Sequence, residues 1–279
     1  MFLPRSLRSF AVVPAMALAV VTASTESFAT HSWGNYHWAR TSNPFTLKLG
    51  DNLSGTWDGD GYLVIASADW NKANALNTLV VLGQANPKNC RPTSGMVQVC
   101  NSTYGSNGWL GIAQIWVSGA HITKGAVKLN DTYFNNATYN FPAWRQFVMC
   151  QEVGHTFGLD HQDEAFDNGN LLTCMDYTNK PETNQHPDLH DYDQLALIYG
   201  HNDGTTTVSS AVAPSGNAAN ETSPGMADIV LDTPREWGRL VRSSHRGRTE
   251  VYERDLGGGQ KVFTFVTWAI DEPGHRRPR

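Results

Sequence analysis

The chain has 279 residues, of which 40% are hydrophobic and 17% are charged, and its formal net charge at pH 7 is −5. This composition supplies one sizeable hydrophobic core and excludes an intrinsically disordered protein. Residues 31–201 carry nine Lys and Arg against fifteen Asp and Glu, whereas ten of the 21 basic residues lie in the last 52 positions. Because the acidic part has no helix-length basic patch with interleaved aromatic residues, we exclude nucleic acid as a partner.

The first 29 residues have the pattern of a secretory signal peptide. Arg5 and Arg8 precede an apolar run over residues 10–21, which is too short to span a membrane with ordinary flanks. Small residues follow, so we expect cleavage after Ala23 or Ala29. A membrane anchor is the alternative. The sequence therefore predicts a secreted, extracellular protein that is a monomer and has no membrane contact once the signal is removed.

Four cysteines fit an oxidising compartment, where an even set predicts two disulfides. Three connectivities exist for four cysteines. A turn-rich loop between Cys90 and Cys100 favours a local bridge, which leaves Cys150 to pair with Cys174. A zinc site built from all four cysteines is excluded because their spacing lacks the paired C-x-x-C form.

Hydrophobic periodicity predicts a succession of strands and helices up to residue 201. Apolar and polar residues alternate at 44–49, whereas apolar residues within 57–73 recur at helical spacing. Pro142 is well placed in the first turn of a long helix. The predicted strands are 44–49, 78–82, 96–99, 111–117 and 126–129, and the predicted helices are 57–73, 141–159 and 188–199.

Composition changes after residue 201. Residues 202–227 are rich in Gly, Ser, Thr, Ala, Pro and Asn, which predicts a flexible linker. Residues 228–279 form a small C-terminal segment of unknown role, with one clear strand at 262–268. This segment is either a small appended module or an extra hairpin on the main domain.

The chemistry centres on residues 151–161, Gln-Glu-Val-Gly-His-Thr-Phe-Gly-Leu-Asp-His. Gln151 and His155 are one helical turn apart and share a face, with Glu152 beside them. Gly158 can adopt the positive φ that ends a helix and turns the chain, which brings His161 back toward His155. Two imidazoles beside a carboxyl form the layout of a metal-dependent hydrolase.

Glu152, His155, Gly158 and His161 match the pattern His-Glu-x-x-His-x-x-Gly-x-x-His, so the chain resembles the metzincin-clan zinc endopeptidases, and in outline the matrixins. Residues 174–177, Cys-Met-Asp-Tyr, resemble the family's methionine turn, with Met175 at its centre. Residues 125–131 resemble the strand before the active-site helix, and residues 191–200 resemble the matrixin closing helix. The likeness covers roughly residues 44–201, within a metallopeptidase domain that we place at 30–201.

The resemblance implies an α+β fold, in which a twisted mixed sheet, an active-site helix, the methionine turn and a C-terminal helix enclose a substrate cleft. It implies zinc as cofactor, His155 and His161 as ligands and Glu152 as general base. Met175 would form the floor beneath the metal. Tyr177 lies two residues after the methionine, the spacing at which astacins and serralysins place a tyrosine beside zinc, where it would stabilise an oxyanion. The substrate would be a peptide or protein in extended conformation.

Gln151 departs from the family, which has histidine as first ligand. An amide oxygen is neutral and harder than imidazole, so zinc binding through Gln151 should be weaker. From the motif we predict a secreted zinc-dependent endopeptidase. Because of Gln151, the alternative is a pseudopeptidase, a catalytically impaired or inactive binding protein of the same fold. Matrixin zymogens have a prodomain cysteine that blocks zinc, and we expect that control to be missing here.

The loop after His161 is rich in oxygen ligands, which suit a hard cation. Calcium is therefore a second candidate cofactor, and a calcium-stabilised structural protein is a third, weaker alternative. The residues concerned are Asp160, Asp163, Glu164 and Asp167.

Overall fold

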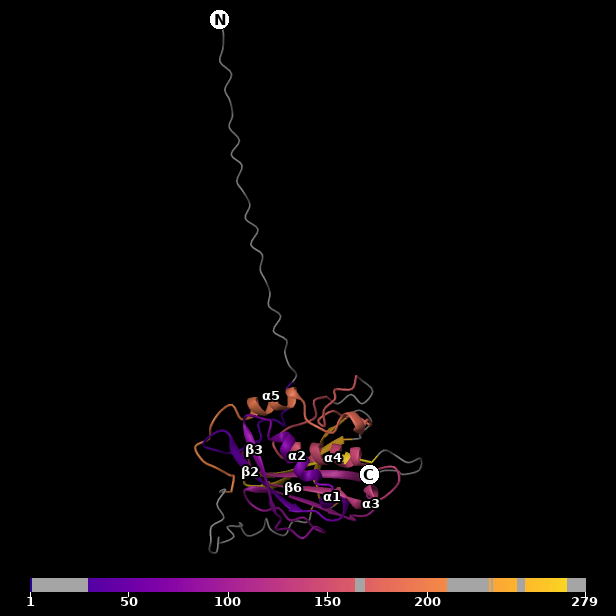
Figure 1. The fold of residues 1–279 in the computed structure, drawn as a ribbon. Helices are drawn as coiled ribbons and strands as arrows, with labels where there is room; N and C mark the ends of the chain where they lie inside the picture. The colour runs from indigo at the N-terminus through magenta and orange to yellow at the C-terminus, as the bar shows by residue number, and fades with distance from the viewer. Residues whose placement is uncertain (2–29, 164–168, 210–230, 232, 245–248, 270–279) are drawn as a thin grey trace.

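The computed structural model describes residues 1, 30–163, 169–209, 231, 233–244 and 249–269 (Figure 1). The predicted signal peptide, the acidic residues Glu164 and Asp167, and most of the predicted linker lie outside these residues. No helix in the described ranges is long and apolar enough to cross a bilayer.

Across the described residues, nine strands form one mixed sheet at the centre of the molecule (Figure 1). Its order is β3-β2-β4-β6-β5-β9-β8-β7, and the short β1 pairs with β6. Neighbours from β3 to β6 are parallel, whereas β5, β9, β8 and β7 pair antiparallel. The strands are β1 (His37–Trp38), β2 (Phe45–Asn52), β3 (Leu76–Leu82), β4 (Met96–Ser102), β5 (Trp109–Ser118), β6 (His121–Asn130), β7 (Arg239–Ser243), β8 (Thr249–Gly257) and β9 (Gln260–Trp268).

Both faces of the sheet are buried at β5. Ala113, Ile115 and Val117 belong to the main core, which includes the residues of α4, whereas Ile112 and Trp116 belong to a second cluster. Successive side chains of a strand point to opposite faces, so the two clusters lie on opposite sides of the sheet. The second cluster contains Leu231, Trp237 and Trp268. The C-terminal segment therefore shares this second cluster with the strands of the main domain.

Helices α2 and α4 contact each other and contribute to the main core. Pro142 begins α4, and Asp188 caps α5 through a reciprocal pair of hydrogen bonds with Asp191. The helices are α1 (Thr56–Gly59), α2 (Tyr62–Trp70), α3 (Asp131–Phe134), α4 (Pro142–His155) and α5 (Leu189–Ile198), with a 3₁₀ turn at Pro181–Thr183.

The predicted mixed sheet with few helices is confirmed, and several boundaries differ. The helix predicted at 57–73 is interrupted, because Gly61 has φ +69° and separates α1 from α2. The helix predicted at 141–159 ends at His155, four residues early. The strands β1, β7 and β8 were not predicted.

The chain just after residue 201 remains in contact with the domain. Amides of Asp203, Thr207 and Ser209 donate to the carbonyls of Arg40, Ala39 and Gly95 at 2.8–2.9 Å. In the described part of residues 228–279, β9 pairs along β5, and β8 and β7 extend the same sheet.

Candidate active site

The chain turns back sharply after α4 and brings two histidines together. Gly158 has φ +93°, and a Cβ there would collide with the carbonyl oxygen of Tyr36. The N-terminal segment holds this return loop, because Trp33 N–H donates to the Gly158 carbonyl at 2.8 Å and Asp160 N–H donates to that of His31 at 2.6 Å. Gly158 thus has the positive φ that the sequence predicted for the turn.

His155 and His161 lie edge to face, with ring centroids 4.7 Å apart. His155 is fully buried, and its Nδ1–H donates to the Leu159 carbonyl at 2.9 Å. Because that hydrogen bond takes the ring proton, Nε2 carries a lone pair, and it has no hydrogen-bond partner among the described residues. Burial holds the pKa of His155 well below its usual value. The ring is therefore neutral and suited to bind a metal.

Glu152 lies within the same buried region. Its exposed fraction is 0%, and neither carboxyl oxygen makes a well-formed hydrogen bond within the part of the chain that the structure describes. Burial raises the pKa of this carboxyl to about 8. The backbone of β5 covers the carboxyl closely, since a Cβ at Gly111 would come within 2.8 Å of its Oε1.

Gln151 uses both ends of its amide. Its Nε2 donates to the carbonyls of Cys174 at 3.0 Å and Asp176 at 3.4 Å, and its Oε1 accepts from the Thr267 hydroxyl at 2.8 Å. The residue that stands in place of the first histidine therefore joins the methionine turn to β9. Nothing in the motif indicates Thr267, which is 116 positions away.

The methionine turn packs closely beneath α4. Met175 is fully buried, and a Cβ at Gly154 would come within 2.8 Å of its sulfur. A disulfide joins Cys150 to Cys174, and a second joins Cys90 to Cys100, which are the expected pairs. Tyr177 is 5% exposed, and its ring centroid lies 6.1 Å from that of His161. Tyr177 thus lies near His161, and Met175 lies against α4 at Gly154.

Strand β9 lies across this site. Phe265 stacks on His155, with ring centroids 4.6 Å apart and planes 10° apart. In the antiparallel register, Ala113 of β5 pairs with Phe265, and Gly111 pairs with Thr267. The hydrogen-bonding edge of β5 is therefore taken by the protein's own chain.

Of the four predicted calcium residues, the structure describes Asp160 and Asp163, and neither belongs to a metal-ligand cluster among the described residues. Asp160 forms an ion pair with Arg242, and its other oxygen accepts from the His161 backbone N–H at 2.9 Å, so its charge is already compensated. Asp163 is described, and the other two acids fall outside the described ranges.

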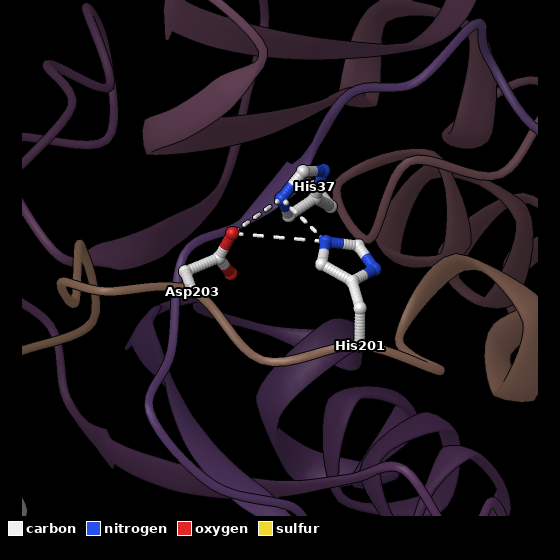
Figure 2. Close-up of side chains that lie close together, drawn as sticks. All are labelled: His37, His201 and Asp203. Atoms are coloured by element: carbon white, nitrogen blue, oxygen red, sulfur yellow. Dashed lines mark hydrogen bonds and ion pairs between the residues drawn. The ribbon is translucent and has the colours of Figure 1, made fainter.

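A different group of side chains has metal-ligand spacing. Among the described residues, His37, His201 and Asp203 are the one set of three or more His, Cys, Asp or Glu with ligand atoms within 4.8 Å of one another (Figure 2). These residues lie on β1 and after α5, and the sequence motif did not indicate them.

No family model and no curated protein matches the chain. Among solved structures, it is similar to high choriolytic enzyme 1, a hatching enzyme zinc-protease from the medaka fish Oryzias latipes, with 12% identity and a TM-score of 0.34 over 59% of this chain and 94% of that one. It is also similar to myroilysin, with 12% identity and a TM-score of 0.36 over 61% of this chain and 98% of that one. At these scores the likeness carries no argument about function, and the chain's own geometry has to supply it.

Proposed function

We propose that this chain is a secreted, metal-dependent endopeptidase whose described form is closed by its own strand β9. One observation carries the proposal. The Glu152 carboxyl and His155 Nε2, which have no hydrogen-bond partner among the described residues, lie in the same buried region as the His161 ring. Buried polar atoms without partners are costly in a core, and a bound cation relieves that cost.

Zinc fits this set of donors. His155 and His161 would hold the ion through imidazole nitrogen, and the Gln151 amide oxygen would be a third, weaker ligand once Thr267 no longer donates to it. Bound zinc supplies a Lewis acid that polarises the scissile carbonyl and makes water more acidic. No calcium site is proposed.

The chain's own groups would carry the proton transfers. Glu152 would take a proton from the attacking water and return it to the leaving amine. The Tyr177 hydroxyl would donate a hydrogen bond to the developing oxyanion. Met175 would form the apolar floor of the site, held by the Cys150–Cys174 bridge.

The substrate would be an extended peptide. Such a peptide gains affinity by pairing its backbone with an exposed sheet edge, and the edge nearest Glu152 belongs to β5. Because β9 pairs along that edge, β9 would have to leave before a substrate enters. The described state is therefore a latent one in this proposal.

A pseudopeptidase is the second candidate, and one observation favours it. Both ends of the Gln151 amide are satisfied by the protein, so the site is packed without a metal at its first ligand position. In that case the fold would serve binding alone.

Casein cleavage by the purified mature protein, before and after release of β9, separates these two candidates. From the released form we expect zinc-dependent cleavage that stops on chelation, is lost in Glu152→Ala and persists in Glu182→Ala, a control at an exposed glutamate. Absence of cleavage from both the closed protein and a form released from β9 would favour the pseudopeptidase.

A further inference from the structure

His37, His201 and Asp203 gather at a place remote from the motif residues in sequence (Figure 2). His37 Nε2 lies 3.3 Å from both His201 Nε2 and Asp203 Oδ1, and His201 Nε2 lies 3.6 Å from the same oxygen. The side chains of His37 and Asp203 are 8% and 10% exposed, whereas that of His201 is 51% exposed. The three ligand atoms thus face one another at the edge of the protein, within reach of solvent.

The outer ring nitrogen of His37 is turned toward the other two side chains. Its Nδ1 lies 2.7 Å from the Asn35 carbonyl and must donate to it, because a carbonyl only accepts. In the tautomer that carries its proton on Nδ1, the Nε2 lone pair faces Asp203 Oδ1 at 3.3 Å, a place that a metal ion would fill. A metal-binding histidine has this arrangement, with its other ring nitrogen bonded to a carbonyl.

Asp203 is held with one oxygen toward the histidines. Its Oδ2 accepts from Arg40 Nη1 at 2.7 Å and from the Arg40 backbone N–H at 3.1 Å, which leaves Oδ1 facing His37 and His201. Arg40 also donates to the His201 carbonyl, so it fixes the backbone beside both residues.

The spacing is that of a tetrahedral metal site. Ligands at about 2.0–2.1 Å from zinc lie about 3.3–3.4 Å from one another in a tetrahedron, against observed separations of 3.3, 3.3 and 3.6 Å. Two imidazoles favour zinc or a neighbouring transition metal over calcium or magnesium. His121 Nε2 lies 3.3 Å from the same Asp203 oxygen, because β1 pairs His37 with His121 of β6.

We propose that His37, His201 and Asp203 bind a second, structural transition-metal ion, with zinc as the expected metal and water as its fourth ligand. This ion would fasten the N-terminal segment to the chain after α5. The same segment supports the active-site loop, since the Trp38 indole N–H donates to the Thr156 carbonyl at 2.9 Å. The proposed ion thus stabilises the fold near the motif without taking part in peptide cleavage.

The test counts zinc in the full mature chain, loaded with zinc alone after chelation and dialysis. We expect wild type to hold one zinc ion more than His201→Ala, with a parallel loss in His201→Gln, which keeps a hydrogen-bonding side chain. His186→Ala is the matched control, because His186 is 56% exposed and pairs with Asp69 at 2.5 Å without a second histidine. It should hold the wild-type number of ions.

Thermal unfolding gives a second readout. Zinc at about 100 times its Kd should raise the Tm of wild type and His186→Ala by about 5–10 °C more than that of either His201 variant, and calcium should not. Equal zinc content and equal zinc-induced Tm shifts in wild type and His201→Ala would overturn the proposal. The result is independent of the active site, because the difference of one ion holds whether or not Glu152 and its neighbours bind zinc.

Discussion

Gln151 would determine the zinc affinity of the proposed catalytic site. It lies on the same helix face as His155, and its amide is hydrogen-bonded to the Cys174 carbonyl and the Thr267 hydroxyl. A histidine at this position would keep one ring N–H for the Cys174 carbonyl and present its second nitrogen to the ion. We expect Gln151→His to tighten zinc binding by roughly tenfold or more, measured by competition with a chelator in the His201→Ala background. An unchanged Kd would mean that residue 151 does not reach the metal.

Glu152 should make the stability of the metal-free chain depend on pH. Its carboxyl loses a proton above a pKa of 4.5 in the unfolded chain and near 8 in the folded chain. Between these values the unfolded chain binds fewer protons, so the free energy of unfolding falls as pH rises. Glu152→Gln should remove that slope and raise stability at pH 8 in chelator by about 2–5 kcal/mol.

Urea unfolding at pH 5 and pH 8 measures the effect of this substitution. Glu182→Gln, at an exposed glutamate, is the control and should unfold like wild type at both pH values. If Glu152→Gln is no more stable than wild type at pH 8, the carboxyl is ionised in the fold.

At this scale the sequence was informative only locally. The spacing of Glu152, His155 and His161 predicted which side chains meet, because a helix turn and a glycine fix their relation within eleven residues. Thr267 and Phe265 touch the same site through strand pairing. Long-range pairing leaves no signal in the motif, so the partners of Gln151 and His155 were not predicted.

Among the elements, the return loop after α4 depends most on a single backbone conformation. Gly158 has φ +93° and contacts the Tyr36 backbone. Gly158→Ala should lower the free energy of unfolding by at least about 1–3 kcal/mol and weaken zinc binding, because His161 loses its position relative to His155. Gly169→Ala, which has open space around its Cβ, should leave both unchanged in the same urea and zinc titrations.

Strand prediction succeeded where a segment was a run of mostly apolar residues. The strands at 78–82, 96–99 and 111–117 lie within β3, β4 and β5, and β4 and β5 are buried along almost their whole length. β1 has two residues, too few for any period. In β8, Val251 is buried, but its neighbours Glu250 and Tyr252 are half-buried, so the expected contrast between faces is weak.

For the whole molecule, the main question is whether the strands of residues 228–279 block access of a substrate to the proposed active site. We expect that a site-specific protease sequence inserted within 210–230, once cut, allows the β7–β9 fragment to leave and raises peptidase activity at least tenfold. A synthetic peptide of residues 260–268 should restore the low activity, and a scrambled peptide should not. Equal activity before and after release of the fragment, shown by size-exclusion chromatography, would contradict closure by β9.

The pairing of β9 with β5 has a kinetic consequence because both strands belong to one chain. A tethered strand competes for the edge of β5 at an effective concentration on the order of millimolar. A free peptide at micromolar levels therefore occupies little of that edge, even when it pairs equally well. Once the tether is cut, binding of the β7–β9 fragment is bimolecular, so dilution favours its dissociation. The length and integrity of the connection, rather than any change in the site itself, would then set the peptide concentration at which the proposed peptidase activity begins.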